Sequence, residues 1–242
     1  MTDRLAELEA SLAALRAKIA TACAAADRDP AEITLVAVTK TFPVSDIKLL
    51  SQLGVTDIGE NRDSEAAPKA AACAAAGLTV RWHFVGQLQV NKVPSVAGYA
   101  DMVHSVDRLR LAEALGRRSL AAGRVISCLI QVSLDDPGQS AGRGGAGRGG
   151  AGPAEVGDLA AAIAAHDGLR LAGVMGIAPL GEPARPAYAQ LRQIAETIRA
   201  AYPSAQVISA GMSGDMGSAI AEGATHVRIG TALLGGRPPF LR

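Results

Sequence analysis

The sequence predicts an α/β protein in which eight strand and helix units close into a single (β/α)8 barrel of the TIM type, preceded by one extra helix. Short runs rich in Val, Ile and Leu alternate along the chain with stretches rich in Ala and Leu. Because alternation of strand with helix implies a parallel sheet, the units are expected to lie side by side. A chain of 242 residues with 49% hydrophobic residues is long enough for one such barrel, so residues 1–242 are expected to form one domain.

The extra helix is expected over residues 4–25. There the apolar residues recur at steps of three and four with charged residues between them, as in an amphipathic helix. This segment lacks the apolar core of a signal peptide, and no later run approaches the length that crosses a bilayer. The expectation is a cytoplasmic protein without membrane contact.

The eight expected strands are short runs of β-forming residues. They are residues 33–38, 55–58, 80–85, 102–106, 125–132, 169–174, 206–208 and 226–229. Helical composition is clearest over residues 45–53, 108–121, 156–165, 187–200 and 215–222. An open, doubly wound sheet is the main alternative, because the same alternation of elements also builds that fold.

Charge and cysteine content narrow the class of partner. Lys and Arg number 24 against 23 Asp and Glu, so there is no broad basic surface for nucleic acid or an anionic membrane, and a small molecule is favoured. The three cysteines, Cys23, Cys73 and Cys128, are far apart and are expected to be reduced and packed as small apolar residues. Residues 137–153 are dominated by glycine and are expected to form a flexible loop.

Lys40 is the first candidate for chemistry. It follows an apolar strand and precedes Pro43, where a barrel strand meets its active-site loop. Partial desolvation of a lysine favours its neutral amine, which can attack an aldehyde and form a Schiff base. An ordinary exposed lysine at a strand end is the alternative from position alone.

Two glycine-containing segments follow the seventh and eighth expected strands, where barrels often bind phosphate. The first offers Ser209, Gly211, Met212 and Ser213, and the second offers Gly230 and Thr231. Hydroxyls and exposed backbone N–H groups at such turns suit an anion. Each glycine could instead serve only its turn.

Three further polar residues lie on or just after expected strands. Strand alternation places Arg228 inside the barrel if Val227 and Ile229 face outward, where it either faces a ligand or joins an ion pair. Asn61 falls in a polar cluster just after the second expected strand, and His83 falls in another around the third. A helix cap and a hydrogen-bonded core histidine remain their alternatives. GxSxG, HExxH and Walker patterns are absent from the sequence, which disfavours ordinary hydrolases and nucleotide-binding proteins.

Seven motifs in order resemble the pyridoxal phosphate homeostasis proteins, the YggS/PROSC family, whose fold is similar to the N-terminal barrel of alanine racemase. They are AVTKTFP at 37–43, IGEN at 58–61, WHFVGQLQVNK at 82–92, HSVDR at 104–108, GVMGIAP at 173–179, SAGMSGDM at 209–216 and HVRIGTALLGGR at 226–237. The match spans nearly the whole chain. Arg62 departs from the family, because many relatives carry an aromatic residue there.

The resemblance implies that Lys40 forms a Schiff base with pyridoxal 5′-phosphate and that Arg228 faces its pyridine nitrogen. A cation there disfavours protonation of that nitrogen and weakens the ring as an electron sink. The implied phosphate contacts are Ser209, Gly211, Met212, Ser213, Gly230 and Thr231, and the implied ring neighbours are Asn61, His83 and Met175.

The resulting functional hypothesis is a monomeric protein that holds pyridoxal 5′-phosphate and hands it to apo-enzymes, with transient contacts to them. The alternative is a small amino-acid racemase, which needs a second acid/base group across the substrate. In alanine racemase a second domain supplies a tyrosine for this role. Tyr99, Tyr188 and Tyr202 are expected in or beside helices and not at strand ends, so the carrier is favoured.

Overall fold

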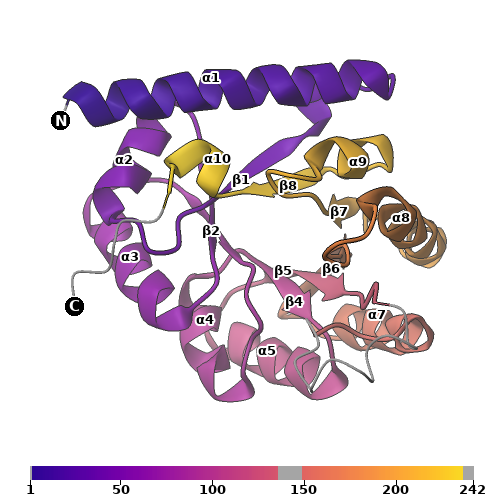
Figure 1. Ribbon diagram of the computed structural model, residues 1–242. Coiled ribbons are helices and arrows are strands. Elements are labelled where there is room, and N and C mark those ends of the chain that lie inside the picture. The colour runs from indigo at the N-terminus through magenta and orange to yellow at the C-terminus, as the bar shows by residue number, and fades with distance from the viewer. Residues whose placement is uncertain (1, 136–148, 237–242) are drawn as a thin grey trace.

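The computed structural model describes residues 2–135 and 149–236, and in them eight parallel strands close into a barrel in chain order (Figure 1). β1 pairs with β2 on one side and with β8 on the other, which completes the closure. This confirms the (β/α)8 fold and excludes the open, doubly wound sheet. The strands are β1 (Thr34–Val38), β2 (Asp57–Glu60), β3 (Arg81–Phe84), β4 (Met102–Val106), β5 (Ile126–Gln131), β6 (Leu169–Met175), β7 (Val207–Ser209) and β8 (His226–Ile229).

Helices surround the barrel, and α1 precedes it as expected. They are α1 (Thr2–Ala25), α2 (Val44–Gln52), α3 (Asp63–Ala75), α4 (Val93–Tyr99), α5 (Leu109–Ala121), α7 (Val156–Ala164), α8 (Ala184–Ala201), α9 (Met216–Ala221) and α10 (Thr231–Leu234). Short 3-10 turns occur at η1 (Pro30–Glu32), η2 (Val90–Lys92) and η3 (Pro153–Glu155). α3, α4 and α10 complete the alternation outside the five stretches where helical composition is clearest.

Strand alternation divides the side chains into two sets. Outward residues such as Ala37, Ile58 and Val227 are buried between the barrel and its helices. Inward residues fill the barrel itself, where Met102, Leu129, Ala172 and Met175 form a small apolar cluster. The interior is therefore a packed core below the mouth and not a pore.

α1 lies across the outside of the barrel beside α2, α9 and α10 (Figure 1). Its buried side chains follow the expected helical spacing: Leu8, Leu12, Leu15, Ile19 and Cys23. Arg4 at the start of α1 donates to Asp46 Oδ2 at 2.7 Å and to the carbonyl of Leu234 at 2.9 Å. Because these partners belong to α2 and α10, α1 joins the first and last units of the barrel.

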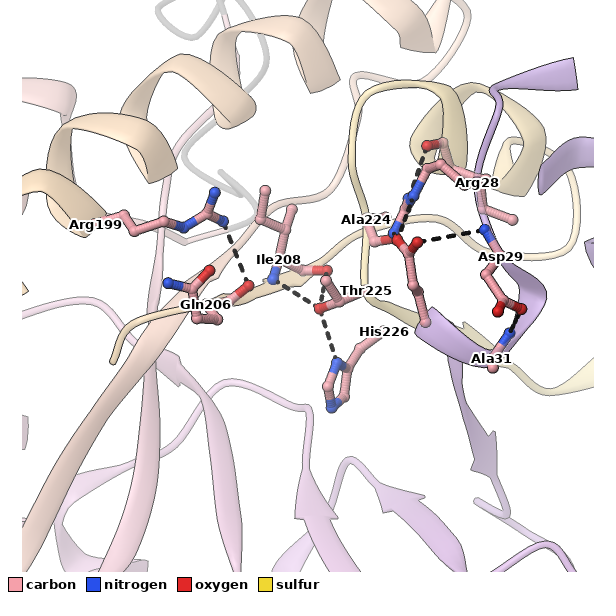
Figure 2. Close-up of polar contacts among 11 residues, drawn as sticks. Arg28, Asp29, Ala31, Arg199, Gln206, Ile208, Ala224, Thr225 and His226 are labelled. Carbon is pink, nitrogen blue, oxygen red and sulfur yellow. Dashed lines mark hydrogen bonds and ion pairs between the residues drawn. The ribbon is translucent and has the colours of Figure 1, made fainter. Parts of the chain in front are cut away.

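The turn after α1 ties the start of β1 to the segment before β8. Arg28 donates to the carbonyls of Ile220 and Ala224 at 2.9 and 2.7 Å, and Asp29 caps η1 by accepting from the backbone of Ala31 (Figure 2). Charged donors to carbonyls are stronger than neutral ones, so this linkage stabilises the closing edge of the barrel.

Cys23, Cys73 and Cys128 are buried free thiols, as expected. Of the segment 137–153, residues 137–148 lie outside the described residues. Within the remainder, Ala151 bridges Val132 and Pro153 begins η3. No helix in the described ranges is long and apolar enough to cross a membrane.

Candidate functional site

A cavity of about 510 Å³ opens at the carboxyl ends of the strands, the end where (β/α)8 barrels carry their active sites. This volume lies within the usual range for small-molecule sites. Its lining comes from widely separated parts of the chain: Val38, Lys40, Phe42, Asn61, Val85, Gly86, Gln87, Gln131, Ile177, Met212, Ser213, Gly214, Arg228, Gly230, Thr231 and Gly235. The site is therefore assembled by closure of the barrel.

Lys40 lies two residues after the end of β1 and is half-buried at the wall of this cavity. Within the described part of the chain, its Nζ has no hydrogen-bond or ion-pair partner. The next residue, Thr41, has φ of 68°, a left-handed conformation that is strained for a β-branched residue. Its backbone N–H donates to Glu65 Oε2 at 2.8 Å, which helps to hold this bend.

Thr39, the residue before Lys40, is fixed from outside the barrel. Its hydroxyl donates to Glu60 Oε1 at 2.7 Å, and its carbonyl accepts from Lys69 Nζ at 2.9 Å. Lys69 also pairs with Glu60 at 2.6 Å. Burial raises the pKa of Glu60, and the bonds from Lys69 and Thr39 partly offset that rise. Backbone on both sides of Lys40 is thus held by α3 and β2.

The loop after β7 makes one wall of the cavity. Gly211 has φ of 88°, and a Cβ there would lie 2.7 Å from Ala219 Cβ, so only glycine fits this close approach of loop to α9. The backbone N–H of Met212 donates to Asp215 Oδ1 at 2.6 Å, and Tyr188 donates its hydroxyl to Asp215 Oδ2 at 2.7 Å. This fixed turn leaves Ser213 exposed at the cavity.

The segment after β8 makes the adjoining wall. Gly230 and Thr231 line the cavity at the start of α10, and the Thr231 side chain is exposed. Hydroxyls of Ser213 and Thr231 and the backbone of two glycines, Gly214 and Gly230, therefore lie around one part of the cavity. Such a set of small polar groups suits a phosphate.

Arg228 rises from β8 into the floor of the cavity. As strand alternation predicts, Val227 and Ile229 face the outer helices and Arg228 faces inward. It donates to the Ser209 carbonyl at 2.8 Å, the Ser209 hydroxyl at 2.7 Å and the Gly176 carbonyl at 3.0 Å. A guanidinium retains its charge even when buried, so the floor of the cavity is cationic.

Asn61 follows β2 at the cavity wall. Its Oδ1 is buried and, among the described residues, has no hydrogen-bond partner. The helix-cap alternative does not hold, because the N-cap of α3 is Arg62. A Cβ on Gly86 would lie 2.1 Å from the Asn61 carbonyl oxygen, so glycine at 86 permits the segment after β3 to pass close to Asn61. An unpaired buried acceptor is the mark of a group kept for a ligand.

Seven of the eleven residues predicted for the site line the cavity: Lys40, Asn61, Met212, Ser213, Arg228, Gly230 and Thr231. The other four do not line it. Gly211 supports the turn behind it, Met175 belongs to the interior apolar cluster, and His83 and Ser209 are buried below the cavity floor. There His83 forms hydrogen bonds with Asp57 and His104, which agrees with the alternative that it is a hydrogen-bonded core histidine.

The lining also includes residues that were not predicted, and two of them lie two positions beyond a predicted residue. Val85 lines the cavity where His83 was expected, and Ile177 does so where Met175 was expected. Since side chains of one face recur every second residue, each inward position at a strand end has another one layer above it. Applying this two-residue step to the expected strand ends would have identified them.

The three tyrosines lie as expected, in or beside helices. Tyr99 ends α4, Tyr188 lies within α8, and Tyr202 follows α8. None of them lines the cavity as it is described. Burial raises the pKa of Tyr188, as does its hydrogen bond to Asp215, so its hydroxyl stays protonated.

Comparisons with known proteins agree with this geometry. The family described as alanine racemase, N-terminal domain, matches residues 10–238. The pyridoxal phosphate homeostasis protein of Mycobacterium tuberculosis is 41% identical over 249 residues, covering 97% of this chain and 95% of the relative. The protein of the same name from Escherichia coli K12 is 40% identical over 232 residues, covering 94% and 95%.

Solved structures are similar as well. PipY of Synechococcus elongatus, solved with pyridoxal phosphate bound, has a TM-score of 0.78 and 32% identity, covering 94% of this chain and 100% of its own. Alanine racemase of Corynebacterium glutamicum has a TM-score of 0.69 and 14% identity, covering 95% of this chain and 60% of its own. The second likeness concerns the fold alone.

Proposed function

This chain belongs to the family of pyridoxal phosphate homeostasis proteins built on an alanine racemase N-terminal domain, and we propose that it binds pyridoxal 5′-phosphate in the cavity at the barrel mouth. The cofactor contains an aldehyde, a phosphate and a pyridine ring. The cavity offers a cluster of hydroxyls and glycines and a cationic floor, together with an amine and an amide acceptor that have no partner in the part of the chain that the structure describes. The residues present therefore fit the group.

Lys40 carries the proposal, because its amine at the cavity wall has no partner among the described residues. An amine held there can form a Schiff base with the aldehyde, releasing water, and can exchange it again. The hydrogen bonds of the Thr39 carbonyl and the Thr41 N–H hold the backbone on either side of Lys40. The direction from which the Lys40 side chain enters the cavity is therefore set before a ligand binds.

Ser213, Gly214, Gly230 and Thr231 are proposed to hold the phosphate. Of the two candidate serines, Ser213 is favoured, because Ser209 is buried and its hydroxyl is occupied by Arg228 and His104. Gly211 and Met212 act by shaping the turn that presents Ser213.

Arg228 and Asn61 are proposed to face the ring. When bound, the cofactor supplies an electron sink, which works best when the ring nitrogen is protonated. A guanidinium beside that nitrogen opposes its protonation, so Arg228 restrains carbanion chemistry. The apolar walls at Val38, Val85 and Ile177 restrict water around the ring.

The combination favours a carrier over a catalyst. Racemisation needs a second acid/base group opposite Lys40, and Tyr99, Tyr188 and Tyr202 are all placed away from the cavity lining. We therefore propose a cytoplasmic, monomeric protein that keeps the free aldehyde low and transfers the cofactor to apo-enzymes by reversible imine exchange.

The test is the absorbance spectrum of the protein with added pyridoxal 5′-phosphate, followed by borohydride reduction and mapping of the modified peptide. A visible band that reduction fixes onto Lys40 supports the proposal. Lys40→Ala should lose it and Lys92→Ala, an exposed lysine outside the cavity lining, should keep it. Absence of the band in the unaltered protein contradicts the proposal, and robust alanine racemisation would replace the carrier by an enzyme.

A further inference from the structure

A chain of hydrogen bonds crosses the barrel interior below the cavity and ends on Arg228. At the opposite end of the barrel, Asp57 Oδ1 lies 2.9 Å from His83 Nε2. His83 Nδ1 lies 2.8 Å from His104 Nε2, and His104 Nδ1 lies 2.9 Å from Ser209 Oγ. Arg228 donates to the same Ser209 Oγ at 2.7 Å. The chain thus joins β2, β3, β4, β7 and β8.

The two ends of the chain restrict where its hydrogens can lie. Arginine only donates, so Ser209 Oγ accepts from Arg228. An ionised carboxylate only accepts, so His83 Nε2 carries a hydrogen directed at Asp57. Burial alone would raise the pKa of Asp57. The hydrogen bond from His83 and nearby positive groups outweigh burial and bring this pKa below its usual value, so the carboxylate is ionised.

Three arrangements then remain for the middle of the chain. In the first, both imidazoles are neutral: the Ser209 hydroxyl donates to His104 Nδ1, and His104 Nε2–H donates to His83 Nδ1. In the second, one added proton makes His83 an imidazolium, and both middle bonds reverse. In the third, the added proton lies on His104, which donates to His83 Nδ1 and to Ser209 Oγ. In both charged arrangements Ser209 Oγ accepts from His104 as well as from Arg228, and its own hydrogen is displaced from the chain.

The surroundings favour the neutral arrangement. The imidazole of His104 is packed against His83 on β3, His226 and Arg228 on β8. Burial, and then nearby positive charge that includes Arg228, lowers the pKa of His104 well below its usual value, which disfavours the third arrangement. In either charged arrangement the hydrogen of the buried Ser209 hydroxyl loses its acceptor in the chain, and leaving a buried donor unsatisfied is costly. Every donor in the chain therefore points from Arg228 toward Asp57.

This directed chain has a consequence for the cavity. One N–H of Arg228 is committed to Ser209 Oγ, while the same side chain lines the cavity floor. We propose that His83 and His104 are positioning residues, which act through Ser209 to hold Arg228 against the ring of the bound pyridoxal 5′-phosphate. The inference rests on the proposed function for the identity of the ligand, but the hydrogen-bond chain itself does not depend on it.

The chain is tested first in the cofactor-free protein by nitrogen-15 NMR of the imidazole side chains near pH 8. Both His83 and His104 are expected as neutral tautomers with the hydrogen on Nε2. A hydrogen on Nδ1 of His104, or hydrogens on both nitrogens of His83, would overturn the arrangement. This result stands whether or not the protein binds the cofactor.

Its action on Arg228 is tested with His104→Leu, which removes the acceptor for Ser209 without altering the cavity lining. Loss of one bond that orients a charged donor should weaken binding of pyridoxal 5′-phosphate about tenfold. The visible band of the bound cofactor should also shift, and its position should vary with pH where that of the unaltered protein does not. A purely structural role would leave the spectrum of the bound fraction unchanged.

His226→Leu is the matched control. It makes the same change in a neighbouring interior histidine, whose Nδ1 bonds Thr225 and which has no place in the chain (Figure 2). Asp57→Leu is the second variant, at the opposite end of the barrel, and keeps the test open if His104→Leu does not fold. The proposal would be overturned if His104→Leu and Asp57→Leu, where they fold, kept the affinity and spectrum of the unaltered protein. A missing band in the unaltered protein would count only against the proposed function.

Discussion

Two lysines near the end of β1 show how differently this barrel treats the same side chain. Lys69, on α3, is nearly buried and donates to Glu60 and to the Thr39 carbonyl. Lys40, one residue from Thr39, faces the cavity and has no partner in the described ranges. The first lysine is used by the fold, and its bonds hold the backbone that presents the second. Pairing with protein groups, more than burial, separates a structural polar group from one kept for a ligand.

The same contrast holds between the mouth and the lower interior. At the mouth, Asn61 Oδ1 has no partner within residues 2–135 and 149–236, and Ser213 is exposed. Below the floor, Asp57, His83 and His104 are joined in one chain. Buried polar groups destabilise a fold unless they are satisfied, so an unpaired acceptor that lines the cavity is a group that a ligand could complete.

The largest expected effect tests the lysine at the mouth. Lys40→Ala should abolish borohydride-stable attachment of pyridoxal 5′-phosphate, because no other amine lines the cavity as described. Stability should change little, since a half-buried side chain without a partner contributes little to the fold. Mass spectrometry of the reduced protein measures the first effect and chemical denaturation the second. Retained stoichiometric labelling would show that another lysine carries the cofactor.

Lys69→Met should have the opposite effect on stability from Lys40→Ala, because it should destabilise the fold. It leaves the Glu60 carboxylate, 1% exposed, without its cation, and breaking a buried pair in this way costs about 3 kcal/mol of unfolding free energy. The double variant Lys69→Met with Glu60→Gln should recover part of that loss, because no buried charge remains. Chemical denaturation of all three proteins checks this. Equal stability of the single and double variants would mean that Glu60 takes up a proton once Lys69 is removed, so that no unpaired buried charge is left.

Because of the interior histidines, the unfolding free energy should decrease as pH falls. Burial, followed by the charge of His83, lowers the pKa of His226 to about 4. Above about pH 6.5, the ordinary value for histidine, both folded and unfolded chains are neutral at this position. As pH falls toward 4 only the unfolded chain takes up the proton, so the unfolding free energy falls, by about 2 kcal/mol at pH 5.

His226→Leu should remove this contribution while the contribution of His104, in the same direction, remains. Unfolding free energies of the unaltered protein and of His226→Leu, measured at pH 7.5 and 5, give the comparison. The difference between the two proteins should change by about 2 kcal/mol between these values. An unchanged difference would mean that His226 is not kept neutral by its surroundings.

The strand order and most of the helices could be predicted, because each strand and most helices leave a local pattern in the sequence, whereas α3, α4 and α10 were not predicted individually. Outward-facing apolar residues recur at every second position of the strands, for example Ile58, Val103 and Ile229. They pack against the helices, as any barrel of this kind requires. Lys40 and Arg228 were found for a related reason, since a charge within or just after an apolar strand has few explanations.

The depth of each inward residue could not be read from the sequence. His83 and Met175 point inward as strand alternation requires, but they lie one layer below the cavity, and Val85 and Ile177 reach it instead. Layer depth depends on the stagger between neighbouring strands, which is fixed by closure of the whole barrel. The partners of Ser209 were hidden for the same reason, since His104 lies 105 positions away in the chain.

The smallest expected effect separates the two serines. Ser213→Ala removes one hydroxyl from the proposed phosphate site, which should weaken binding of pyridoxal 5′-phosphate about five- to tenfold. Pyridoxal, which lacks the phosphate, should bind equally to the altered and unaltered proteins. Titrations followed by the visible band give all of these affinities.

Ser218→Ala on α9 is the control, because it makes the same change on the neighbouring helix outside the cavity lining and should leave both affinities unchanged. If Ser213→Ala weakens both ligands equally, Ser213 acts on the ring and the phosphate assignment is wrong. If only the phosphorylated ligand is affected, the exposed serine binds the anion. The buried Ser209 then belongs to the paired interior, where its hydroxyl supports Arg228 and does not touch the ligand.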